Sequence, residues 1–223
     1  MKKRTLLSWS SGKDSAWALH VLRQRDDVEV VGLFTTMNEA ADRAAMHAVR
    51  RALVARQAEA AGLPIDFIPL PYPCPNAAYE AAMSDYVAAA RERRIDCFAF
   101  GDLHLEDVRR YREDTLAGTG IEPLFPIWGS DTAAMARTMV DAGLRARVTC
   151  VDPRRLAARF AGCVFDHAFL DDLPHGVDPC GENGEFHTFA FTGPMFHRSL
   201  DVVVGETVER DGFVFSDLLE AEP

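Results

Sequence analysis

The sequence has few of the features that mark membrane, secreted or disulfide-stapled proteins. No apolar run approaches the ~18 residues that span a bilayer, and the apolar stretch after Met1-Lys2-Lys3-Arg4 is too short for a signal peptide. The five cysteines are widely spaced and form no C-x-x-C pair, as is typical of free thiols in a reducing compartment. These absences predict a cytoplasmic protein that does not enter a membrane.

Positive charge is also scarce, with 24 lysines and arginines against 34 acidic residues and a net charge of -10. This excess of acid argues against general binding to nucleic acid or anionic membranes and leaves room only for a local basic pocket. Lysine occurs only at positions 2, 3 and 13, beside abundant arginine and alanine, a bias of GC-rich genomes that favours a bacterial source. The 223 residues, 48% hydrophobic, are enough for a large core.

Apolar runs alternate with helical patterns along the first part of the chain. The runs that predict strands lie at 4–9, 28–34, 65–70, 97–100 and 123–127. Helical spacing starts near Ser15 and returns at 41–61, at 79–90 and at the end of 103–118. This alternation predicts the α/β class, with a doubly wound parallel five-stranded sheet.

The character changes after about Gly129. A helix capped by Ser130 or Asp131 is followed by a strand pattern at 145–151 and a glycine- and proline-containing loop at 174–184. Alternating stretches at 185–192 and 200–208 then lead into an Asp-Gly turn that is typical of a hairpin. We therefore predict a nucleotide-binding domain at 1–128 and a smaller α+β lobe at 129–223 that recognises substrate.

The first chemical motif lies between the first strand and the first helix and reads Ser10-Ser11-Gly12-Lys13-Asp14-Ser15. Small residues let backbone N–H groups face a bound anion, the helix N-terminus adds partial positive charge, and serine and lysine side chains add donors. The motif lacks the Walker A pattern. The alternative interpretation is a serine-rich turn that caps a helix through Asp14.

This string resembles the S-G-G-x-D-S motif of the PP-loop ATP pyrophosphatase superfamily, with Ser11 at a position usually held by glycine. The resemblance implies that the loop, all six residues of it, binds the β and γ phosphates of ATP while the α phosphate is attacked.

Polar residues also follow two other predicted strands. Thr35 and Thr36 come after the second, and Gly101 and Asp102 after the fourth. Because the carboxyl ends of parallel strands face one crevice, we expect these residues to contribute to nucleotide binding. For the two threonines, hydrogen bonding to local backbone is an equally good explanation.

A second motif runs from Asp178 to Thr188 and contains glycines, carboxylates, a thiol and an imidazole. Its carboxylates Glu182 and Glu185 are suited to hold Mg²⁺ with nucleotide phosphates, or to orient an amine and accept its proton. The string resembles the G-E-x-G-E-[FY]-x-T signature of the diphthine-ammonia ligase family within the PP-loop superfamily. Segments at 101–102, 111–114, 126–129 and 193–196 resemble the same family, so the likeness covers nearly the whole chain.

The resemblance implies an ATP-dependent carbon–nitrogen ligase with ATP and Mg²⁺ as cofactors. A substrate carboxylate attacks the α phosphate, pyrophosphate leaves, and ammonia displaces AMP from the acyl adenylate. Diphthine on elongation factor 2 is the implied substrate in an archaeon or eukaryote, and a corrinoid side chain is an alternative carboxylate in a bacterium. A homodimer is left open.

The expected roles follow from the two motifs. Asp14, Glu182 and Glu185 are the predicted catalytic residues, with Glu182 or Glu185 binding Mg²⁺. The residues expected to contact the carboxylate substrate are Arg112, Glu113, Asn183 and His187.

Four other interpretations compete. Cys180 with His175 or His187 would make a thiol hydrolase, and these three residues with a fourth ligand would make a zinc site, although neither has a complete signature. The arginines at 91–94 and 109–112 would suggest RNA, which the net charge opposes. A regulatory nucleotide-binding module of the universal-stress-protein kind would give Glu182 and Glu185 no role.

Overall fold

The structure, a computed structural model, describes residues 1–44 and 49–221, and its first half is built on a mostly parallel sheet. The strands are β1 (Lys3–Ser8), β2 (Val28–Asn38), β3 (Arg43–Ala44), β4 (Ile65–Leu70), β5 (Cys97–Ala99) and β6 (Glu122–Leu124). Five of them are parallel in the order β4-β2-β1-β5-β6, and β3 pairs antiparallel with the end of β2. The order reverses direction between β1 and β5, where α/β sheets bind ligands.

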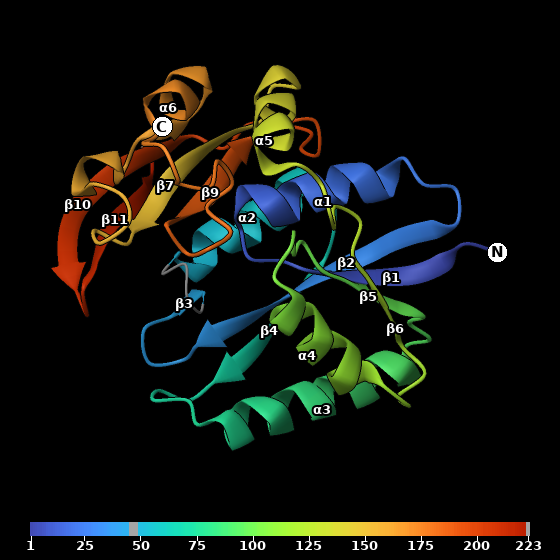
Figure 1. Ribbon diagram of the computed structural model, residues 1–223. Helices are drawn as coiled ribbons and strands as arrows, with labels where there is room; N and C mark the ends of the chain where they lie inside the picture. The colour runs from blue at the N-terminus through green and yellow to red at the C-terminus, as the bar shows by residue number, and fades with distance from the viewer. Residues whose placement is uncertain (45–48, 222–223) are drawn as a thin grey trace.

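Helices cover both faces of this sheet (Figure 1). They are α1 (Lys13–Arg23), α2 (Arg51–Ala61), α3 (Asn76–Glu92) and α4 (Glu106–Leu116). Alternation along β1 places Leu6 in the apolar cluster under α3 and α4, and Leu7 in the cluster under α1 and α2. The predicted doubly wound α/β fold is confirmed.

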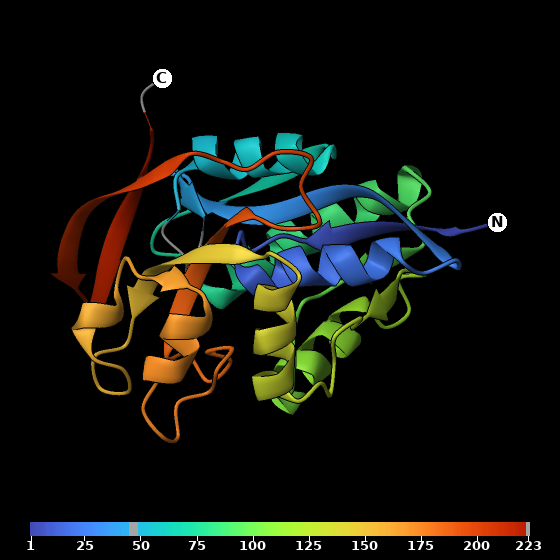
Figure 2. The same ribbon diagram turned by 90° about the horizontal axis from the view of Figure 1, so that it is seen from above.

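The second half carries an antiparallel sheet with two helices beside it (Figure 2). Its elements are α5 (Thr132–Asp141), β7 (Arg145–Val151), a 3₁₀ turn (Ala158–Phe160), β8 (Val164–Phe165), α6 (His167–Asp172), β9 (Phe186–Thr192), β10 (Val202–Arg210) and β11 (Phe213–Glu220). Strand β7 is central, with β9 along one edge and β8 and β11 sharing the other. The predicted hairpin turn is present at Asp211-Gly212, where both residues have positive φ.

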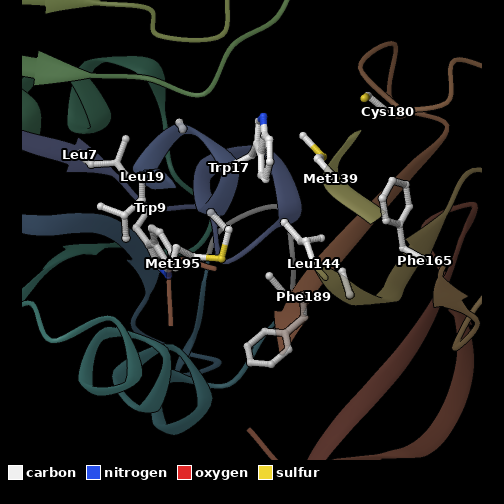
Figure 3. Packing of buried hydrophobic residues seen from close by; sticks show 14 of the residues in the cluster. Leu7, Trp9, Trp17, Leu19, Met139, Leu144, Phe165, Cys180, Phe189 and Met195 are labelled. Carbon is white, nitrogen blue, oxygen red and sulfur yellow. The ribbon is translucent and has the colours of Figure 1, made fainter. Parts of the chain in front are cut away.

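The two halves share one hydrophobic core. The larger buried cluster runs from Leu7 and Leu19 in the first half to Leu144, Phe165 and Phe189 in the second, and Figure 3 shows these side chains in one packed layer around α1. Because α1 is buried from both sides, the phosphate loop that precedes it has a rigid base on either half. The domain boundary near Gly129 stays a prediction.

The structure corrects three expectations. Of the helix predicted over 41–61, residues 45–48 lie outside the described part of the chain, and the described helix runs over Arg51–Ala61. Residues 41–42 form a turn instead, and 43–44 form β3, which pairs with the extended end of β2. That short strand also makes the sheet six-stranded. Thr35 and Thr36 do not follow the second strand but lie within it, because β2 continues to Asn38 alongside β4.

In the part of the chain that the structure describes, no helix has the length and apolarity to cross a membrane.

Candidate functional site

The phosphate loop links β1 to α1 through an unusual backbone conformation. Ser11 has a φ of 68°, in the left-handed region that costs a residue with a side chain about 1 kcal/mol. Its side chain is fully buried, and its hydroxyl has no hydrogen-bond partner within the described residues. The strained position is therefore the one where the superfamily motif usually has glycine.

Strand β9 of the second half holds this loop in place. The Ala190 N–H donates to the carbonyl of Ser11 at 2.9 Å, and the Lys13 N–H donates to the Thr188 hydroxyl at 3.1 Å. A Cβ added to Gly12 would lie 3.2 Å from the Thr188 carbonyl oxygen, so the fit leaves little space for a side chain. The second motif thus ends in the residue that fixes the first one.

A buried glutamine also holds the phosphate loop in place. The Gln57 side chain of α2 donates to the carbonyls of Ser11 at 2.9 Å and Ala190 at 2.6 Å, and it accepts from the Trp9 indole at 2.9 Å. One side chain therefore joins β1, the loop, α2 and β9. Sequence reasoning missed it, because a lone glutamine in an alanine-rich helix carries no local signal of its role.

The side chain of Lys13 is buried where α1 packs against the second half of the chain. Its ammonium lies 2.9 Å from Asp14 Oδ2, donates to the Cys180 carbonyl, and stands 5.6 Å and 5.2 Å from the ring centroids of Phe165 and Phe186. Burial acts to lower the pKa of Lys13, but the neighbouring acidic groups, Asp14 foremost, together outweigh it and the pKa is raised. The site thus contains a fixed positive charge.

A cavity of about 340 Å³ opens beside the loop, and we call it the loop cavity. It brings together nine of the predicted residues: Ser10, Lys13, Asp14, Ser15, Gly101, Asp102, Arg112, Glu182 and His187. The predicted position of Gly101 and Asp102, directly after β5, is confirmed. A Cβ at Gly101 would lie 3.0 Å from the Ser15 backbone nitrogen, so there is little space for a side chain where the segment after β5 meets α1.

Glu182 enters the cavity from the second motif. Its Oε1 accepts hydrogen bonds from the backbone N–H groups of Leu103, at 2.8 Å, and His104, at 3.4 Å. The preceding Gly181 has a φ of 67°, and a Cβ there would lie 2.8 Å from the Phe186 carbonyl. Glycine at this position therefore lets the loop turn so that Glu182 reaches across to the loop after β5.

Arg112 of α4 closes another side of the cavity. Its guanidinium stacks on Phe100 at 4.8 Å, and its Nη1 donates to the Tyr79 hydroxyl at 3.5 Å. Its Nε lies 3.7 Å from Asp102 Oδ2, and neither of these two buried atoms has a hydrogen-bond partner within the described residues. The two residues thus form a long ion pair in which Arg112 Nε can still donate a hydrogen bond and Asp102 Oδ2 can still accept one.

Three carboxylates share this enclosed space. Burial raises the pKa of Asp14, of Asp102 and of Glu182, and the Asp14 charge raises the last two further. Their mutual repulsion favours a ligand that carries positive charge. Among the described residues, however, no group of three histidine, cysteine, aspartate or glutamate side chains is arranged to hold a metal ion alone.

His187 separates the loop cavity from a second cavity of about 500 Å³, which we call the hairpin cavity. The hairpin cavity lies between the end of β2 and the β10–β11 hairpin and includes Asn38, Tyr72 and Phe215. Burial, with Lys13 nearby, lowers the pKa of His187 to about 4. The imidazole is therefore neutral at pH 7.

Seven predicted residues do not line the loop cavity. Ser11 and Gly12 support it through their backbone, and Thr35 and Thr36 lie in β2. The other three are further from its interior: Glu113 pairs with Arg109 at 2.8 Å, Asn183 is exposed, and Glu185 is buried. Glu185 Oε1 accepts from the Asp178 N–H at 3.2 Å and from Asn183 Nδ2 at 3.3 Å, so it closes its own loop.

The environment of Cys180 disfavours a thiol nucleophile. The side chain is buried, its Sγ contacts the Thr132 carbonyl oxygen at 3.4 Å, and burial raises the pKa of the thiol far above neutrality. A thiol in such surroundings stays protonated and unreactive. Its backbone carbonyl accepts a hydrogen bond from Lys13 of the phosphate loop.

A parallel sheet with an anion-binding loop after its first strand, and an antiparallel lobe that clasps this loop, defines a PP-loop protein with a C-terminal lobe. Residues 2–122 match the model of the diphthamide synthase N-terminal domain, and residues 131–217 match that of the diphthamide synthase C-terminal domain. The chain therefore belongs to the diphthamide synthase family, which confirms the resemblance inferred from the two motifs.

Curated relatives carry the name diphthine–ammonia ligase. The protein of Danio rerio is 30% identical over 126 residues, which are 52% of this chain and 48% of the relative. Those of Rattus norvegicus and Homo sapiens are each 25% identical over 118 residues, covering 50% of this chain and 44% of each relative. The matched region thus spans about half the length of these relatives.

Proposed function

We propose that this protein is an ATP-dependent amide ligase that adenylates a substrate carboxylate, releasing pyrophosphate, and transfers ammonia to the activated acyl group. The single observation that carries the proposal is the convergence of the phosphate loop, Asp102, Arg112 and Glu182 on one cavity. The names of the relatives favour diphthine as the carboxylate.

The phosphate loop supplies what a triphosphate needs. Ser10 and Ser15 bring hydroxyls, the N-terminus of α1 adds partial positive charge, and the buried ammonium of Lys13 adds a full one. Preorganised donors of this kind stabilise the charge that develops on departing pyrophosphate. Because β9 and Gln57 fix the loop, little reorganisation is needed when the nucleotide binds.

The carboxylates fit a magnesium ion that arrives with the nucleotide. Mg²⁺ keeps several waters and binds through one or two carboxylates together with phosphate oxygens, so a site without three protein ligands is suitable. Asp14, whose pKa burial raises, is the proposed ligand. When bound, the ion would neutralise phosphate charge and make the α phosphorus a better electrophile.

Amide formation then needs ammonia rather than ammonium at the acyl carbon. In the first step a carboxylate oxygen bonds to the α phosphorus. The bond between that phosphorus and the oxygen shared with the β phosphate breaks, and pyrophosphate leaves. In the second, ammonia adds to the acyl carbon, loses a proton and expels AMP. The carboxylate of Glu182 lines the cavity, burial raises its pKa, and it is the proposed proton acceptor.

The test is release of AMP and pyrophosphate from ATP in the presence of Mg²⁺ and ammonium. Candidate acceptors are elongation factor 2 carrying diphthine and corrinoid carboxylates, and Asp14→Ala serves as the control. AMP that depends on one acceptor and disappears in Asp14→Ala supports the ligase and names its substrate. Intact turnover in Asp14→Ala contradicts the assignment of the site.

A nucleotide-binding module without catalysis makes a different prediction. It would bind ATP and release no AMP with any acceptor, and Glu182→Gln would change nothing beyond nucleotide affinity. The ligase predicts the reverse for this variant, with ATP affinity largely kept and turnover lost. Measuring ATP affinity and AMP release on the same preparations therefore separates the two functions.

A further inference from the structure

We propose that the outer edge of β10 pairs with β10 of a second copy of this chain, so that the protein forms a homodimer with twofold symmetry. Strand β10 is the outermost strand of the antiparallel sheet, and among the strands that the structure describes it pairs with β11 alone. Its other edge therefore offers backbone N–H and C=O groups to a further strand. Figure 2 shows the β10–β11 hairpin at one end of the molecule, where a second copy has access to it.

The hairpin gathers exposed apolar side chains. Seven large hydrophobic residues are exposed in the described chain, and four of them lie in β10 and β11: Val203, Val204, Val208 and Leu219. Strand β10 is nine residues long and contains neither proline nor lysine, two residues that commonly block a free edge. A partner strand on this edge would account for both features, because it would satisfy the backbone and cover valine side chains.

The charged residues of the two hairpin strands differ in their partners. Asp217 and Glu220 of β11 form ion pairs with arginines in the first half of the chain, so they hold the hairpin to its own molecule. Glu206, Glu209 and Arg210 of β10 are exposed, and within residues 1–44 and 49–221 no ion pair includes them. Their charges are available to a second copy.

The side chains of β10 divide between two faces of the sheet. The register with β11 shifts once, and beyond the shift the pairing is continuous from Thr207 to Arg210. The Arg210 guanidinium lies 5.3 Å from the ring centroid of Phe215, which is the direct partner of Val208. Arg210 and Val208 therefore share a face, and by alternation Glu206 belongs to the same face.

This face reads glutamate, valine, arginine along β10, an order that is complementary to itself. When two such strands run antiparallel with Val208 opposite its own copy, Glu206 of each copy lies opposite Arg210 of the other. On the other face Thr207 meets Glu209, which places a hydroxyl beside a carboxylate. Opposite charges and β-branched residues that face each other across strands stabilise a sheet. Each position from 206 to 210 thus has a favourable partner.

The neighbouring symmetric registers lack this match. Hydrogen-bonded and non-hydrogen-bonded pairs alternate in an antiparallel ladder, so twofold symmetry requires one residue to face its own copy. A ladder centred on Glu206 or on Glu209 brings two carboxylates together, and one centred on Thr207 leaves Arg210 opposite Val204. In the register centred on Val208, the second copy also places a carboxylate beside Arg210, which lines the hairpin cavity.

Charge exchange tests the pairing by sedimentation equilibrium of the full chain without nucleotide. We expect a dimer of the unaltered protein at about 100 µM, where even a weak specific complex is populated. Glu206→Arg alone and Arg210→Glu alone place like charges at both ion pairs, and each should raise the dissociation constant of the dimer about tenfold or more. The double variant, and an equimolar mixture of the two single variants, should restore it. A monomeric unaltered protein, or a dimer that the single variants leave unchanged, overturns the proposal.

A cross-link tests the register. Residues directly opposite in an antiparallel sheet have Cβ atoms about 5 Å apart, close to the separation that a disulfide spans. Val208→Cys should therefore give a covalent dimer under mild oxidation, detected on a non-reducing gel. Val203→Cys is the matched control, because it is an exposed valine of the same strand that lies far from its own copy in this register. Equal cross-linking of both variants, or of neither above the unaltered protein, overturns the proposal.

Discussion

The phosphate loop and the loop from Asp178 to Thr188 are both short, glycine-containing and rich in polar groups, yet they are held in opposite ways. The first is fixed from outside, because Gln57 and Ala190 bind the Ser11 carbonyl. The second is closed mainly from within, because Glu185 accepts a hydrogen bond from the Asp178 N–H, although Lys13 also donates to its Cys180 carbonyl. The phosphate loop therefore depends on the second half of the chain for its conformation. The second loop, by contrast, places Glu182 against the backbone after β5.

The second loop also divides its glutamates between two tasks. Glu182 lines the cavity, as Lys13 and Asp14 of the first loop do, whereas Glu185 is buried within the loop itself. Glu182 and Glu185 are the same residue type three positions apart in one motif, so only their surroundings distinguish them. A single motif thus supplies both a candidate reactive side chain and the residue that stabilises its own loop. Variants of the two glutamates test this division of roles directly.

The largest expected effect is on turnover in Glu182→Gln. The amide keeps an oxygen that can accept from the Leu103 N–H but loses the negative charge in the cavity. We expect AMP release to fall about a hundredfold or more, as for loss of a general base, with little change in the free energy of unfolding. Steady-state kinetics and urea unfolding of one preparation measure both, and unchanged turnover would contradict the role of Glu182.

Breaking the external support should cost the most stability. Gln57→Leu keeps the volume but leaves the Trp9 indole N–H and the Ala190 carbonyl without this partner. We expect unfolding to be easier by about 3 kcal/mol, measured by urea denaturation. Gln24→Leu, at an exposed glutamine, is the matched control and should change stability little. Equal effects would show that the buried network contributes nothing.

The buried imidazole predicts a pH dependence. His187 has an ordinary pKa of 6.5 in the unfolded chain and about 4 in the folded one, so the unfolded state takes up its proton first as the pH falls. The contribution of neutral His187 to the free energy of unfolding is complete above pH 6.5. It falls by about 3 kcal/mol between pH 6.5 and pH 4. Urea unfolding across this range should show that His187→Gln lacks this loss, and identical profiles would refute the shift.

The internal support of the second loop is smaller. Glu185→Ala removes the acceptor of the Asp178 N–H and of the Asn183 amide, and we expect a loss of about 2 kcal/mol. ATP affinity should change less than stability, since Glu185 does not line the cavity. A variant of full stability with abolished turnover would instead place Glu185 in the chemistry.

The smallest effect sharpens the account of the phosphate loop. Ser11→Gly relieves the left-handed φ of 68° and removes a buried hydroxyl without a partner in the described chain. We expect a gain of about 1 kcal/mol in stability, because the strain outweighs the added flexibility of the unfolded chain. Thermal unfolding measures it, and a clear loss of stability would mean that the hydroxyl is bound in the native state.

Much of the fold could be predicted from the sequence, because its signals are local. Apolar runs with β-branched residues gave the parallel strands, and Asp211-Gly212 marked the hairpin. The failures lie where tertiary pairing decides. The continuation of β2 to Asn38 depends on its partner β4, and residues 43–44 join the sheet only by pairing with the end of β2.

The candidate site was predictable to a similar extent. Motif residues at strand ends, such as Asp102, reach the cavity because parallel strands end at one edge of the sheet. Gln57 was missed because its role arises only from the packing of α2 on β9. The different surroundings of Glu182 and Glu185 depend on backbone turns at Gly181 that the sequence pattern does not reveal.

The most direct test of the central claim follows the carboxylate oxygens through the reaction. If the acyl substrate is labelled in its carboxyl group with the heavy isotope of oxygen, adenylation transfers one labelled oxygen to AMP, because the carboxylate attacks the α phosphorus. The account predicts labelled AMP, detected by mass spectrometry, together with unlabelled pyrophosphate and an amide product that depends on ammonium. Unlabelled AMP, or ADP in its place, would contradict it.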